Sequence, residues 1–84
     1  MKHAGAKALG ALEPVLREIR RLGVLTEKSP GIFYRKRVAF LHFHEDAAGL
    51  FADLKIAGAY QRFRVSSMAE RKAFLVAAKM AAAS

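Results

Sequence analysis

The chain has 84 residues, with 15 lysines and arginines against seven acidic residues, so its formal net charge is +8. It contains no cysteine, which excludes disulfides, thiolate metal sites, iron–sulfur clusters and cysteine nucleophiles. The length suits one small domain, whose thin core a partner subunit would help to stabilise. No apolar run approaches the roughly 18 residues that a membrane span needs, so we expect a cytoplasmic protein with no membrane partner.

Residues 1–12 are basic and rich in alanine and glycine, and they show no firm helical stripe. We expect them to form either a mobile arm or a loose extra turn, and residues 13–82 to form a single domain. Pro14 suits the first turn of a helix, and Gly23 suits a left-handed cap at its end. An apolar stripe with helical spacing runs through this segment and consists of Leu12, Val15, Leu16, Ile19 and Leu22.

Four segments rich in β-branched and aromatic residues follow, each bounded by residues typical of turns. They are Ile32–Arg35, Val38–His44, Leu50–Leu54 and Gln61–Val65. The basic triplet Arg35-Lys36-Arg37 predicts a tight hairpin tip between the first two. The short connections predict an antiparallel meander of four strands.

Ser67 and Glu70 form a capping-box pattern, in which the serine hydroxyl caps a backbone N–H and the glutamate reaches back. The pattern predicts a C-terminal helix that ends at about residue 82. Steps of about 100° per residue give it a buried face made of Ala69, Ala73, Val76, Ala77 and Met80, with Phe74 at its edge. We therefore expect a two-layer α+β fold, with an N-terminal helix, a four-stranded antiparallel sheet and a C-terminal helix on one side of that sheet.

The second predicted strand is apolar on both faces, which is unusual for an antiparallel strand with one solvated side. Strict alternation places Val38, Phe40 and His42 on one face, away from Leu41 and Phe43. Two helices cover only one face of a sheet. We expect a homodimer to bury the other face, with Tyr34, Val38, Phe40 and Phe51 as interface candidates. The alternatives are that residues 1–12 fold over it or that a local twist buries both sides.

His42 and His44 stand two apart on a predicted strand, so both imidazoles could converge on one metal ion. Such a site needs three or four ligands. Asp53 on the next strand is the best-placed addition, since His3 lies in the expected arm. Two other interpretations stay open, and the first is the more common for such histidines. Either His42 packs in the sheet while His44 begins a turn, or the pair performs general acid–base catalysis.

The basic residues form the second group of candidates, because a tip and a helix rich in cations could contact a phosphate backbone. The nucleic-acid candidates are Arg17, Arg20, Arg21, Arg35, Lys36 and Arg37. No helix-turn-helix pattern and no RNA-recognition strand motif accompanies them, so any such binding would be independent of base sequence.

Three short segments carry a family resemblance: Phe40-Leu41-His42-Phe43-His44, Gly49-Leu50-Phe51-Ala52-Asp53-Leu54 and Arg64-Val65-Ser66-Ser67. Together they resemble an uncharacterised bacterial family called the luciferase-like domain of unknown function, a label that does not imply the flavin monooxygenase barrel. Members are longer between the third and fourth strands, where this chain has only Lys55–Tyr60. The layout is also similar to YjbR-like modules, in architecture only. Neither resemblance implies a catalytic mechanism.

We therefore expect a small non-catalytic domain that acts through protein–protein interaction, chiefly self-association, and that needs no cofactor. The first alternative is sequence-independent nucleic-acid binding through the basic tip and helix. The second alternative is a metal-dependent or acid–base enzyme centred on His42 and His44.

Overall fold

A six-stranded sheet forms the frame of the molecule, which is described by a computed structural model of residues 1–84. The elements in chain order are β1 (Lys2–His3), α1 (Ala6–Ala11), α2 (Glu13–Arg21), β2 (Thr26–Ser29), β3 (Ile32–Arg35), β4 (Val38–Asp46), β5 (Gly49–Ile56), β6 (Ala59–Arg64) and α3 (Met68–Ala83). Five strands form a meander in the order β2-β3-β4-β5-β6, and every neighbouring pair is antiparallel. The α+β class is confirmed, whereas the expected count of four strands is wrong because β1 and β2 join the sheet.

β1 and β3 share one edge of β4. β3 pairs with β4 as far as His42, and β1 continues along the same edge opposite His44 and Glu45. Beyond β1, the backbone N–H of Ala4 donates to the carbonyl of Phe43, and that of Gly5 donates to the carboxylate of Glu45. Residues 1–12, expected as an arm or a loose turn, thus contain a strand and the helix α1.

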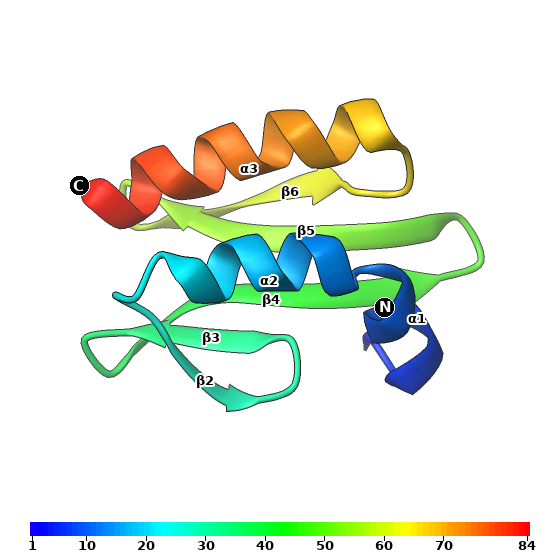
Figure 1. Cartoon of the computed structure of the whole chain (residues 1–84), viewed down its shortest axis with the longest axis horizontal. Coiled ribbons are helices and arrows are strands. Elements are labelled where there is room, and N and C mark those ends of the chain that lie inside the picture. The colour runs from blue at the N-terminus through cyan, green and yellow to red at the C-terminus, as the bar shows by residue number, and fades with distance from the viewer.

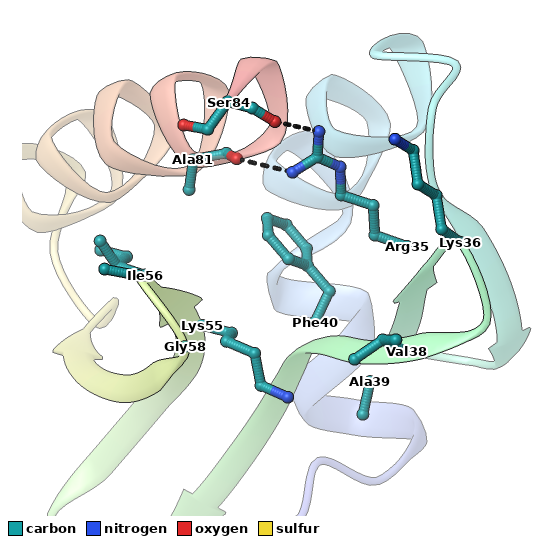
Figure 2. Close-up of a pocket in the computed structure, with 11 residues that line it drawn as sticks. Arg35, Lys36, Val38, Ala39, Phe40, Lys55, Ile56, Gly58, Ala81 and Ser84 are labelled. Atoms are coloured by element: carbon teal, nitrogen blue, oxygen red, sulfur yellow. Dashed lines mark hydrogen bonds between the residues drawn. The ribbon is translucent and has the colours of Figure 1, made fainter.

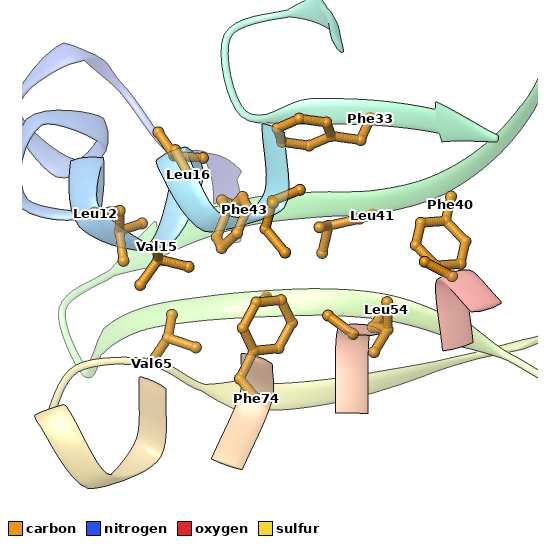
Figure 3. Packing of buried hydrophobic residues seen from close by; sticks show 14 residues of the cluster. Leu12, Val15, Leu16, Phe33, Phe40, Leu41, Phe43, Leu54, Val65 and Phe74 are labelled. Atoms are coloured by element: carbon orange, nitrogen blue, oxygen red, sulfur yellow. The ribbon is translucent and has the colours of Figure 1, made fainter. Parts of the chain in front are cut away.

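Helices α2 and α3 both cover the same face of the sheet, as expected (Figure 1). A cluster of 14 buried residues fills the space between helices and sheet (Figure 3). From α2 it takes Val15, Leu16 and Ile19, as the apolar stripe predicts. Pro14 lies in the first turn of α2 and Gly23 adopts a φ of 73°, so the predicted start and cap are confirmed.

α3 begins at the predicted capping box, with the Ser67 hydroxyl accepting from the backbone N–H of Glu70 and the Glu70 carboxylate accepting from that of Ser67. Its buried face is rotated from the predicted one, so that Phe74 moves from the edge to the centre. Phe74 is fully buried, whereas Val76 and Met80 are 60% and 69% exposed. The helix is apolar almost all round, so packing of the large Phe74 ring decides its rotation. No helix combines the length and the apolar character that a membrane crossing requires.

A β-bulge in β4 changes which side chains share a face. Phe33 pairs with Leu41 and Tyr34 with Ala39, so Phe40 is an extra residue between them. Phe40 is 5% exposed and belongs to the core beneath the helices. The expectation that Phe40 and His42 share a face is therefore wrong, because it assumed unbroken alternation.

Candidate metal centre

The sheet face that the helices leave uncovered, here called the open face, carries all three histidines of the chain. His3 stands opposite His44 in the β1–β4 pair, and directly opposed residues project from the same face. His42 lies two positions along β4 and shares that face. The ring centroids of His3 and His44 are 4.9 Å apart, and those of His42 and His44 are 5.6 Å apart.

Ligand atoms of the three imidazoles lie within 4.8 Å of one another. Nitrogens bound to one tetrahedral ion at about 2.1 Å are about 3.4 Å apart, so a small side-chain rotation closes the triangle. His3 was set aside because it lies in the expected arm, and a strand of two residues, Lys2 and His3, leaves no recognisable pattern in the sequence. Its position follows from the pairing of β1 with β4, which only the structure describes.

His44 is 9% exposed. Both of its ring nitrogens are buried and make no side-chain hydrogen bond of good geometry, although the backbone of Lys2 lies close enough to favour the charged ring. Nε2 lies 3.2 Å from Oδ2 of Asp53, but the approach lacks the direction of a hydrogen bond. Buried polar atoms without partners destabilise a fold, so a role beyond packing is the simplest reason to retain them.

Burial lowers the pKa of both His42 and His44 from the ordinary histidine value, because it disfavours the charged ring. Neighbouring imidazoles add to the effect for each of them. Neutral imidazole is the form that binds metal ions, so burial favours the binding form of His42 and His44.

Asp53, the expected extra ligand, has a different position in the cluster. It stands opposite His42 on β5, and both its oxygens accept 2.8 Å hydrogen bonds from Arg62. This guanidinium holds the pKa of the Asp53 carboxyl below its usual range. Because Arg62 engages both oxygens, Asp53 is poorly available as a direct ligand. It stands beside His44, where carboxylates commonly orient metal-binding histidines.

Tyr60 closes the other side of the cluster, and sequence reasoning did not connect it with the histidines. Its hydroxyl lies 3.1 Å from Nε2 of His42, and the two ring centroids are 4.9 Å apart. Burial raises the pKa of Tyr60, so the phenol keeps its proton and can donate it to a neutral imidazole. Three imidazoles are thus flanked by a phenol and by the Asp53–Arg62 ion pair.

Two of the three nucleic-acid candidates on α2 form ion pairs within the molecule. Arg20 lies 3.1 Å from the carboxylate of Glu13 and 2.7 Å from that of Glu27. Arg21 lies 3.0 Å from Glu18. Arg17 makes no ion pair, so one of the three predicted helix cations lacks an acidic partner.

The predicted hairpin tip borders a cavity of about 430 Å³, between the β3–β4 and β5–β6 turns and the end of α3. Arg35 crosses this cavity and donates to the backbone carbonyls of Ala81 and Ser84 (Figure 2). Lys36 and Arg37 form the turn itself, with φ values of 50° and 70°. Arg35 therefore supports the end of α3, while Lys36 and Arg37 remain without ion pairs.

The four interface candidates do not share one surface. Tyr34 and Phe51 lie half-buried on the open face, and Phe40 lies in the core. Val38 is 54% exposed beside the hairpin tip. The open face therefore mixes histidines, tyrosines and cations with Phe51, and is less apolar than strict alternation indicated.

No protein-family model, curated protein or solved structure matches this chain. The resemblances to the luciferase-like and YjbR-like families stay predictions.

Proposed function

We propose that the protein binds one divalent late first-row transition-metal ion, zinc above all, through His3, His42 and His44. The observation that carries this proposal is the convergence of the three imidazoles, one of which buries both of its ring nitrogens. Imidazole suits zinc, copper and nickel, and the chain has no thiolate to compete for them. Three protein ligands leave one tetrahedral position for water or another ligand.

The surroundings of the site support the same proposal. The Asp53 carboxylate, fixed by Arg62, lies 3.2 Å from His44 and can hold the N–H of that ring once the other nitrogen binds an ion. The Tyr60 hydroxyl occupies Nε2 of His42 and would give way if this nitrogen took the ion. Because the chain has two tyrosines and no tryptophan, ion binding should change tyrosine fluorescence.

Zinc affinity, measured by competition with a chromophoric chelator, tests the proposal. His3→Ala should lower affinity by more than the roughly 10- to 100-fold typical of losing an outer partner. Asp53→Asn should fall within that range, and Lys72→Ala, an exposed control, should leave affinity unchanged. The proposal fails if the native protein does not compete with the chelator, or if His3→Ala binds zinc as the native protein does.

Self-association is the second candidate function, and exposed apolar residues of α3 support it better than the sheet does. Met68, Val76 and Met80 are exposed along one side of this helix at spacings of four and eight residues. A second copy packed along this stripe would bury it. Light scattering after size exclusion should give a dimer mass that Val76→Lys reduces to a monomer mass, and a monomer mass for the native protein at high concentration would end this candidate.

A further inference from the structure

We propose that the open face also binds single-stranded nucleic acid, with bases stacked on Tyr34, Phe51 and Tyr60 and phosphates on the cations beside them. This surface is distinct from the basic tip and helix that the sequence indicated. It does not depend on the metal ion.

All three cation–aromatic contacts in the structure lie on this face. Lys28 stands 4.6 Å from the ring centroid of Tyr34, and Lys55 stands 5.0 Å from that of Tyr60. Arg64 stands 5.4 Å from the ring centroid of Phe51. The residues come from β2, β3, β5 and β6, so the pattern extends across the sheet and is not a local feature of one hairpin.

The register places these pairs at useful separations. Phe51 lies opposite Arg64 and Lys55 lies opposite Tyr60, so the two pairs are four residues apart along β5. At about 3.3 Å per residue, this separation is about 13 Å. Two aromatic platforms at that distance, each with a cation, match a strand whose bases alternate with phosphates.

The charge of the face is complementary to such a strand. Lys28 and Lys55 make no ion pair, and Arg64 lies 3.6 Å from Glu70 at the margin. The central carboxylate, Asp53, is held on both oxygens by Arg62, so its negative charge is already matched. Phosphates would therefore meet available lysines on this face, whereas two of the helix arginines are already paired with glutamates.

A nucleic-acid strand can use each pair without rearranging the backbone. Lys28 and Lys55 are long and flexible side chains, which can swing toward phosphates while the bases take their places on the rings. Arg64 is held by the carbonyl of Ala48 and by Glu70, so it would have to leave these partners first. Double-stranded nucleic acid hides its base faces within the stack, so they cannot stack on these rings. The face should therefore prefer single strands.

Fluorescence anisotropy with labelled oligouridylate and oligothymidylate, measured with a chelator present, tests this proposal. Both should bind, and affinity should fall steeply between about 50 and about 200 mM salt. Tyr60→Leu should weaken binding by about tenfold through loss of stacking. The double variant Lys28→Ala/Lys55→Ala should also weaken it and lower the salt slope by about one to two. The ratio of the two affinities shows whether RNA or DNA is the preferred strand.

The matched control is the double variant Lys36→Ala/Arg37→Ala, which removes the same charge from the hairpin tip. It should change affinity by less than about twofold, since these residues lie off the open face. Circular dichroism on each variant confirms that the fold is retained. The proposal is overturned if the tip variant loses as much affinity as the lysine pair. Equal binding of heparin, unaffected by Tyr60→Leu, would also overturn it by showing attraction to any polyanion.

Discussion

The two faces of the sheet differ in what their side chains must satisfy. On the covered face, Leu41 and Leu54 are fully buried and need only fill space beneath the helices. On the open face, polar groups meet one another at fixed distances, as in the two 2.8 Å bonds between Asp53 and Arg62. Substitutions on the covered face should therefore change stability, and those on the open face should change binding.

The largest expected effect is on the covered face. Phe74→Ala removes a fully buried ring that packs edge-on against Phe43 and Phe63, so it should lower the free energy of unfolding by about 3–5 kcal/mol. Urea denaturation measures this loss. Lys72→Ala on the exposed side of the same helix should stay within about 0.5 kcal/mol, and equal losses would contradict the assigned rotation of α3.

The next effect belongs to the open face. Free zinc at about 100 times its Kd should raise the free energy of unfolding by about 2.7 kcal/mol, because the ion binds only the folded chain. Thermal unfolding with and without zinc measures the rise. His3→Ala should lose most of it and Lys72→Ala should keep it. An equal rise in His3→Ala would mean that the ion stabilises the protein from another place.

Loss of the α3 cap should have a smaller effect, on stability alone and not on zinc binding. Ser67→Ala removes the side-chain cap of α3 and should lower the free energy of unfolding by about 1 kcal/mol. Ser67→Thr, which keeps a hydroxyl, should lose less. Zinc affinity should be the same in all three proteins, and a parallel loss of zinc binding would show that the faces are coupled.

The smallest effect is the pH dependence of the metal-free protein. The pKa values of His42 and His44 are lowered in the folded state, so the unfolded chain binds more protons. Their contribution is fully present above the unfolded pKa, about 6.5, and is lost as pH falls toward the lower folded values. Urea denaturation should show stability declining below neutrality, and His42→Gln/His44→Gln should flatten the curve. A native protein that gains stability on acidification would contradict this sign.

The elements with strong local patterns could be predicted from the sequence. α2 has a clear apolar stripe, and α3 has a capping box, so both helices were located correctly. The polar sequence of β2 carries no alternation, and pairing with β3 alone makes it a strand. The rotation of α3 depends on where Phe74 fits, and a helix apolar on most sides leaves that choice to tertiary packing.

The candidate site was also predictable only where a local sequence pattern marks it. The spacing of His42 and His44 on one strand placed two imidazoles together, because alternation is a local property of a strand. His3 and Tyr60 join them through pairings between distant strands, which no local pattern encodes. Asp53 was expected to bind the metal directly. Its carboxylate is instead engaged by Arg62, and this contact depends on the register of β5 and β6, which the sequence does not reveal.

The shortness of β1 has a consequence for how quickly a bound ion would leave. One of the three ligands sits on a strand of two residues, whereas the other two belong to the longest strand of the sheet. Short terminal strands open locally far more often than a domain unfolds. Opening of β1 would free His3 and leave the ion on two imidazoles, so residence time would be governed by fraying of the first residues. Loss of the ion through opening of β1 would let the protein release a bound ion without global unfolding.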